Sequence, residues 1–199
     1  LEGSIFMAGA IIDWLKNNLQ VFDNYSELHD ILNNNSINSE IVMVPAFTGL
    51  GAPHWKPNSR ASISGLTRDS NRNDIITSSV QSISLQTHDL IKAINEDTSN
   101  LFENPISSIK VDGGLIENDW FIQNLSDICN IKISKSNEQE ATALGTASLS
   151  ALGSKEIKSL REFNIKKHKN TEFTPKIEKK IREEIIENWN LALNKTISV

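Results

Sequence analysis

The sequence predicts an α/β fold with parallel pairing in at least part of its sheet. Short apolar runs typical of buried strands alternate along the chain with segments whose apolar residues recur at helical spacing. The 199 residues are 38% hydrophobic and 23% charged, which is ordinary for a globular protein. The chain is therefore long enough for one domain with its own core, or for one domain and a small appendage.

The first part of the chain predicts two helices and two strands. An apolar stripe indicates the first helix, and the second is more polar. The continuous apolar run 41–44, closed by Pro45, is typical of a buried strand. Residues 45–60 are rich in Gly and Pro and fit no period, which indicates a long ordered loop. The predicted elements are, in chain order, a helix over 4–19, a helix from about 26 to 33, and strands over 41–44 and 61–66.

The second part begins with the strongest helix signal in the chain. Apolar residues step by three and four from Ile76 to Ile94, and Asn73 is a plausible N-cap. A terminal helix, predicted to be capped by Thr174 and Pro175, carries an apolar stripe from Ile177 to Leu193. The remaining predicted elements are a strand over 107–112, a helix over 118–129, a strand over 131–133 and a helix over 140–152.

Composition argues against several classes of function. A net charge of -5, with Lys and Arg interleaved with acidic residues, is a poor match for a nucleic-acid surface. The four histidines are far apart, so we expect no metal site. No apolar run approaches the roughly 20 residues needed to span a bilayer, so we expect no membrane insertion. Because Cys129 is the single cysteine, a reducing cytoplasm is the expected setting.

The most informative segment is a predicted strand that runs into two glycines and a helix, over residues 111–118. Gly113 and Gly114 lack Cβ atoms, so a flat or charged ligand can lie against their backbone. Asn118 can offer a donor and an acceptor to an adenine edge or a ribose. The alternative is a plain strand-to-helix turn in which Asn118 caps the helix. Asp112 is likewise a polar site candidate or the source of an Asx turn.

Small residues mark two further segments. Ala143, Gly145 and Ala147 would let the helix that carries them pack closely against a neighbour. Gly9 lies inside the first predicted helical pattern, where glycine costs about 1 kcal/mol relative to alanine. We expect a close approach, by another helix or by a ligand, to offset that cost. Residues and spacing alone indicate an α/β domain with a nucleotide crevice, and they do not define a reaction.

Several motifs resemble one family of kinases. The run Pro45-Ala-Phe-Thr-Gly-Leu-Gly-Ala-Pro-His-Trp55 resembles the loop typical of glycerol kinases, which belong to the FGGY carbohydrate-kinase family. Residues 61–66 and 74–81, seven residues apart, fit the C-terminal signature of that family. The likeness continues through 84–87, 111–114, 141–145 and on to Trp189, so it covers essentially the whole chain. Xylulokinase-like members usually carry a charged loop where Phe47-Thr-Gly-Leu-Gly51 stands, which favours glycerol over a sugar.

The resemblance implies an actin-like, ribonuclease-H-like ATPase fold that closes over ATP, Mg²⁺ and glycerol. It identifies residues 1–199 as a C-terminal FGGY domain that is incomplete at its N-terminal side. Within it, residues 1–155 would form the α/β core, and 156–199 a linker and the C-terminal helix.

Four nucleotide-binding positions carry over from the family. They correspond here to Gly9, Asp13, Gly114 and Asn118, and Asp13 departs from the usual Gln. His88 departs from a common Arg. A carboxylate at Asp13 would be unfavourable near a polyphosphate.

The resemblance places other functional parts outside the matched region. The catalytic Asp, the glycerol-binding residues and the Thr-Gly phosphate loop precede it in the family, so we expect no catalytic residue in this chain and no activity from it alone. The intact enzyme is expected to be a homo-oligomer. Three alternatives stay open, namely another FGGY sugar or polyol kinase, a non-catalytic nucleotide-binding module, and an interaction domain that has lost nucleotide binding.

Overall fold

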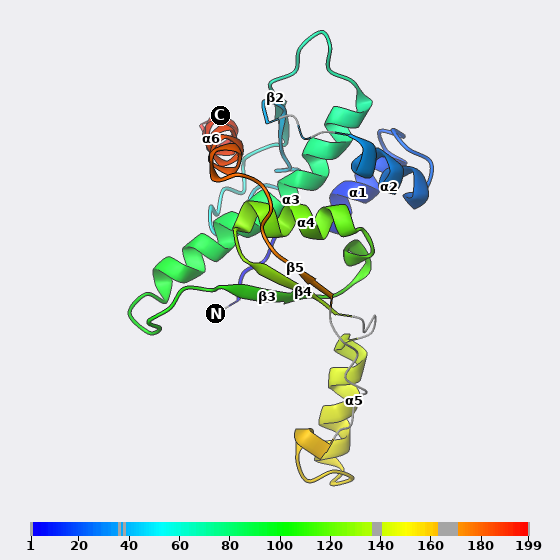
Figure 1. Ribbon diagram of the computed structural model, residues 1–199, viewed down its shortest axis with the longest axis vertical. Coiled ribbons are helices and arrows are strands. Elements are labelled where there is room, and N and C mark those ends of the chain that lie inside the picture. Colours follow the sequence, from blue (N-terminus) through cyan, green and yellow to red (C-terminus); the bar gives the residue numbers. More distant parts are fainter. Residues whose placement is uncertain (1, 36, 38, 137–140, 163–170, 199) are drawn as a thin grey trace.

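The computed structural model describes residues 2–35, 37, 39–136, 141–162 and 171–198 (Figure 1). The elements are, in chain order, α1 (Gly9–Asn17), α2 (Tyr25–Asn34), β1 (Val42–Val44), β2 (Ser62–Ser64), α3 (Arg72–Asp97), β3 (Ser108–Val111), the 3₁₀ helix η1 (Gly114–Glu117), α4 (Asp119–Cys129), β4 (Lys132–Lys135), α5 (Ala141–Gly153), the 3₁₀ helix η2 (Leu160–Glu162), β5 (Thr171–Phe173) and α6 (Lys179–Ile197). None of these helices combines the length and the apolar character needed to span a bilayer.

The described strands form two separate sheets. In the first sheet β1 pairs antiparallel with β2. The second has the order β3-β4-β5, with β3 parallel to β4 and β5 antiparallel to β4. The predicted α/β class and its parallel pairing are therefore confirmed. Helix α4 makes the crossover from β3 to β4, and it lies over this sheet beside α3 (Figure 1).

Helix α3 is the centre of the larger core. It contacts α1, α2, α4 and β1, so it links the first sheet to the helix that packs on the second. Ile76 and Val80 of α3 are almost fully buried, and they belong to the same apolar cluster as Ile11, Leu15 and Ile122 of the neighbouring helices. Burial of such side chains contributes about 1.5–3 kcal/mol each relative to full exposure. The packing around α3 therefore fixes how α1, α2 and α4 lie relative to one another.

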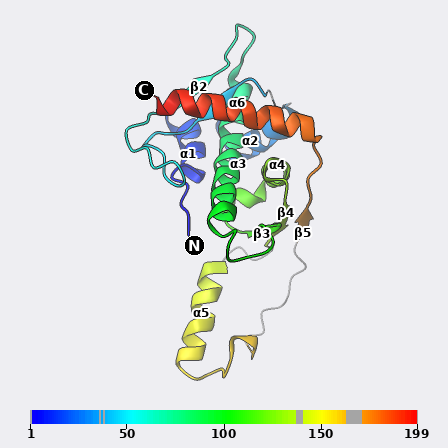
Figure 2. The same ribbon diagram turned by 90° about the vertical axis from the view of Figure 1, so that its left-hand side faces the viewer.

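A smaller apolar cluster lies under α6. Trp189 and Ile185 of α6 pack with Val42 and Val44 of β1 and with Leu85 of α3. Helix α6 runs across the end of the body that lies opposite α5 (Figure 2). The predicted stripe of this helix is confirmed at its centre.

The N-terminal end of that stripe lies differently. Ile181 is 47% exposed, and the helix begins at Lys179 rather than beside Thr174 and Pro175.

Helix α5 stands apart from the rest of the body in both views (Figures 1 and 2). Ala143, Gly145 and Ala147 are exposed, and Leu149 is 60% exposed. A Cβ atom added to Gly145 would meet nothing within 4 Å. The close packing predicted from these small residues is therefore absent from the described structure. Residues 138–140, which precede the helix, lie outside the described residues.

Two further predicted helix starts were wrong. The first helix begins at Gly9, not at residue 4. Residues 6–8 form bends instead, and the Gln86 side chain donates to the backbone oxygen of Met7 (3.4 Å). The cap of α3 is Asn71, not Asn73. Asn71 Oδ1 accepts from Asn73 N (2.8 Å), and Asp74 accepts from Asn71 N (2.9 Å), so the two side chains form a reciprocal capping box.

Candidate functional site

A pocket of about 750 Å³ opens between α1, α2, α3 and the turn between β3 and α4. All four site residues named from the sequence lie on its wall, namely Gly9, Asp13, Gly114 and Asn118. They come from segments about a hundred residues apart, and the packing on α3 brings them together. The structure thus gathers the predicted positions around one space large enough for a nucleoside.

The turn after β3 leaves bare backbone on one wall of the pocket. Gly113 has φ of +95°, a conformation that side chains rarely adopt, and it leads directly into η1. A Cβ atom added to Gly113 or Gly114 would meet nothing within 4 Å, so both glycines face open space. The carboxylate of Asp112 accepts no hydrogen bond from the residues that the structure describes, so the Asx turn considered for it is absent.

Asn118 is the N-cap of α4 and also lines the pocket. Its Oδ1 accepts from Phe121 N at 3.0 Å, which is the capping role considered from the sequence. Its Nδ2 is buried and has no hydrogen-bond partner among the described residues. The capping interpretation is therefore correct, and the second half of the amide stays available to a ligand.

The side of the pocket formed by α2 was not predicted from the sequence. Helix α2 contributes residues at positions i, i+3, i+4 and i+7, which are Tyr25, Leu28, His29 and Leu32. Leu28 and Leu32 are buried, whereas Tyr25 is 52% exposed at the rim. The helical spacing of these four residues is the signal that identifies this wall, because they share one face of α2.

The charged side chains that line the pocket are acidic. Asp13 and Asp112 contribute carboxylates, and the described lining contains no Lys or Arg. Apolar side chains cover much of the interior, for example Ile12, Val80 and Phe121. Like charges repel, so such a pocket suits the uncharged base and ribose of a nucleotide better than its phosphates.

Gly9 begins α1 rather than interrupting it. A Cβ atom added there would meet nothing within 4 Å, so no neighbouring helix approaches it. At this position its cost is smaller than in a helix interior, and the space beside it is the pocket. Asp13 lies one turn further along α1 and is exposed at the same pocket.

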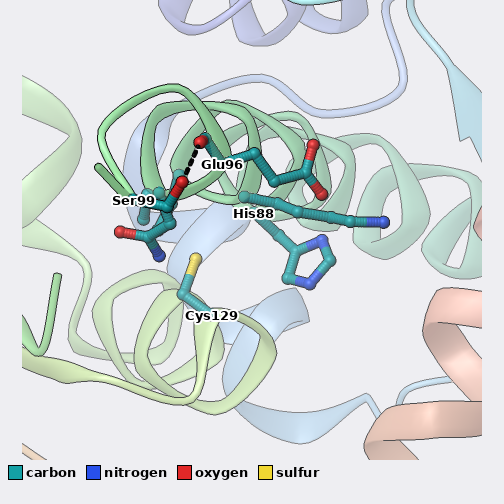
Figure 3. Close-up of a pocket in the computed structure, with 7 residues that line it drawn as sticks. His88, Glu96, Ser99 and Cys129 are labelled. Carbon is teal, nitrogen blue, oxygen red and sulfur yellow. Dashed lines mark hydrogen bonds between the residues drawn. The ribbon is translucent and has the colours of Figure 1, made fainter. Parts of the chain in front are cut away.

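A second pocket, of about 500 Å³, lies between the C-terminal half of α3 and the end of α4 (Figure 3). His88 and Glu96 reach it from α3, and Cys129 faces them from α4. Burial, together with the negative charge of Asp89, raises the pKa of the Cys129 thiol from 9.0 to about 12. The thiol is therefore protonated at neutral pH and is a poor nucleophile.

A comparison with protein-family models shows to which family this chain is related. Residues 1–154 match the model described as the FGGY family of carbohydrate kinases, C-terminal domain. The chain belongs to the FGGY family. This membership agrees with the motifs that carry the resemblance in the sequence.

Similar proteins cover this FGGY chain from end to end. Glycerol kinase of Coxiella burnetii is 37% identical over 198 residues, which is 100% of this chain and 38% of the relative. Glycerol kinase of Pediococcus pentosaceus is 38% identical over 98% of this chain, again 38% of the relative. The chain thus spans less than two fifths of the length of these relatives.

Solved structures match this chain over a similar share of its length and of theirs. The crystal structure of Plasmodium falciparum glycerol kinase with ADP superposes with a TM-score of 0.85 at 32% identity, covering 98% of this chain and 38% of that one. A xylulose kinase from Lactobacillus acidophilus has a TM-score of 0.73 at 21% identity over 97% of this chain and 38% of that chain. The first supports both the fold and the relationship, and the second shows the fold alone. The predicted fold, that of the FGGY C-terminal domain, is confirmed.

This FGGY domain also holds a buried carboxylate that the sequence did not single out. Asp89 Oδ2 accepts from Trp189 Nε1 (2.8 Å) and lies 3.0 Å from His54 Nε2, while its Oδ1 lies 3.3 Å from His88 Nδ1. Burial raises the pKa of Asp89, but the hydrogen bonds from His54, His88 and Trp189 outweigh it and lower the pKa from 3.8 to about 2. His88, where the resemblance led us to expect Arg, faces this carboxylate.

Proposed function

We propose that this chain forms the adenine-nucleotide side of the cleft of an ATP-dependent glycerol kinase. The reaction would transfer the γ-phosphoryl group of ATP to glycerol, giving ADP and sn-glycerol 3-phosphate. The observation that carries the proposal is the pocket that collects Gly9, Asp13, Gly114 and Asn118. Identities of 35–38% to glycerol kinases across the chain favour glycerol over a sugar as the substrate of the whole enzyme.

The residues present fit the adenosine part of the nucleotide. Gly113 and Gly114 offer bare backbone, Asn118 has an unpartnered buried donor, and the apolar lining can receive a flat base. The carboxylates at the rim would repel the phosphates, so the phosphates should point away from this pocket. The catalytic base and the glycerol-binding residues then belong to the part of the relatives that this chain does not match.

Mg²⁺ would accompany ATP and stabilise charge on the transferring phosphoryl group. Among the described residues, no group of three His, Cys, Asp or Glu side chains is placed to hold a metal ion. The described residues therefore offer no ready ligand set for Mg²⁺. We propose a cytoplasmic enzyme whose partners are glycerol and ATP, and self-association of the intact enzyme remains a prediction of the resemblance.

The test is a titration of the 199-residue chain with ADP, in which ligand-observed NMR measures the binding. We expect weak saturable binding, which Gly114→Val should abolish because the new side chain would occupy the pocket. Gly153→Val is the matched control, since a Cβ atom at Gly153 also meets nothing within 4 Å but lies in α5. Absence of binding by the unchanged chain, or equal losses in both variants, would overturn the assignment.

A further inference from the structure

The acidic lining of the pocket proposed to hold the nucleotide disfavours an anionic ligand. Asp13 and Asp112 contribute carboxylates, and no Lys or Arg belongs to the described lining. Lys16 of α1 stays outside this lining, with its Nζ 4.9 Å from the centroid of the Tyr25 ring. The phosphates of a nucleotide bring further negative charge, and like charges repel. The pocket would therefore hold a nucleotide better if its wall gained a positive charge.

His29 is the one residue of the described lining that can gain such a charge near neutral pH. It lies on α2, one turn after Tyr25, on the face that lines the pocket. The residue is half-buried, and its ring makes no hydrogen bond or ion pair with another described residue. Both ring nitrogens are therefore available to a bound molecule.

We propose that ADP and ATP bind preferentially to the chain in which His29 is protonated. This inference rests on the proposed function of the pocket. On binding, His29 takes up a proton from the solvent and no covalent bond forms or breaks, so the imidazolium offsets part of the charge of the phosphates. Because such coupling is reciprocal, a nucleotide that favours the imidazolium must bind more tightly as the pH falls through the range in which histidine titrates.

The other charged or titratable groups around His29 come from α1, α2, α3 and the turn after β3. Carboxylic acids ordinarily titrate near pH ~4, and phenols and amines near pH ~10, while guanidinium groups stay charged. A pH dependence between about pH 6 and about pH 8.5 therefore points to His29 or to the terminal phosphate of ADP, since phosphate groups titrate near pH ~6. The surrounding groups are Asp13, Lys16, Tyr25, Glu27, Asp30, Arg72, Asp112 and Glu117.

Two variants isolate the charge of His29. His29→Gln keeps a polar side chain that cannot be protonated, and His29→Lys carries a positive charge throughout this pH range. Titrations of the 199-residue chain and both variants with ADP, measured by ligand-observed NMR, give the affinities. At about pH 6 the unchanged chain should bind ADP about fivefold more tightly than His29→Gln, and at about pH 8.5 the two should bind equally. His29→Lys should bind more tightly than His29→Gln at both.

The chains are compared with one another at the same pH, so protonation of ADP itself cancels. Adenosine is the matched control ligand because it lacks the phosphates, and His29→Gln should bind it as the unchanged chain does at about pH 6. The inference is wrong if the ratio of ADP affinities between the unchanged chain and His29→Gln does not change with pH. It is also wrong if adenosine shows the same dependence. If the unchanged chain binds neither ligand at any pH, the proposed function itself fails.

Discussion

We expect the free energy of unfolding of this chain to depend strongly on the carboxylate of Asp89. Asp89 lies on α3 and accepts from Trp189 of α6, and His54 of the loop before β2 lies 3.0 Å from it. An ionised carboxylate only accepts hydrogen bonds, so the ring nitrogens that face it carry their protons. Replacing Asp89 by Asn keeps the size of the side chain and removes its charge. The substitution therefore tests whether one anion holds three segments together.

The magnitude follows from the pKa of Asp89. A lowering from 3.8 to about 2 means that the folded chain favours the carboxylate over the neutral acid. Each pKa unit corresponds to about 1.4 kcal/mol, so we expect Asp89→Asn to cost about 2 kcal/mol of unfolding free energy. Asn retains one oxygen that can still accept from Trp189. For this reason the loss should be smaller than for removal of the whole group.

The pH dependence has a defined sign. Because the pKa of Asp89 is lower in the folded chain than in the unfolded chain, the contribution is complete above about pH 4. It is lost as the pH falls toward 2. The difference in stability between the unchanged chain and Asp89→Asn should therefore shrink as the pH falls from about 4 toward about 2. This range lies below the one in which histidines ordinarily titrate.

The assay is urea unfolding of both proteins, followed by circular dichroism, at several pH values across this range. Asp69→Asn is the matched control, because Asp69 is exposed and its carboxylate makes no hydrogen bond or ion pair with the described residues. We expect no change from Asp69→Asn. The reasoning is refuted if Asp89→Asn costs no more than this control at about pH 5, or if the difference grows as the pH falls.

Two further outcomes are expected. Asp13→Gln should strengthen ADP binding by no more than about 1 kcal/mol, because it removes an exposed negative charge from the pocket, and weaker binding in the same titration would mean that the carboxylate makes a needed contact. The chain should self-associate through α5, where Leu149 is 60% exposed, so Leu149→Gln should shift it toward monomer in size-exclusion chromatography with light scattering. Thr146→Gln, on the same helix but already polar, is the control, and an equal effect from it would contradict the role of Leu149.

Local signals in the sequence predicted much of this fold. The long helix around Ile76 and Val80, and the strand–glycine–helix turn at Gly113, are both present. Each depends on residues within a few positions of one another, through helical spacing or through the conformational freedom of glycine. The capping box of Asn71 and Asp74 has the same local character, and its spacing was available in the sequence.

Features set by distant contacts escaped prediction. Strand β5 has only three residues in a charged segment, and it forms because Phe173 pairs with Ile133 some forty positions earlier. The stretch before Gly9 has a helical pattern, yet burial of Met7 and the hydrogen bond from Gln86 hold it in another conformation. Tertiary contacts outweigh a propensity of a few tenths of a kcal/mol per residue.

The two interpretations of Asn118 that the sequence left open are compatible. Capping a helix takes one oxygen lone pair, and binding a ligand can take one N–H, so a single amide can do both. The cap restricts the binding role, since it fixes which atom faces the pocket. Substitutions that remove both atoms lower stability and affinity together, and their effect cannot be assigned to either role. Only variants that retain the oxygen isolate the contribution of Nδ2 to binding.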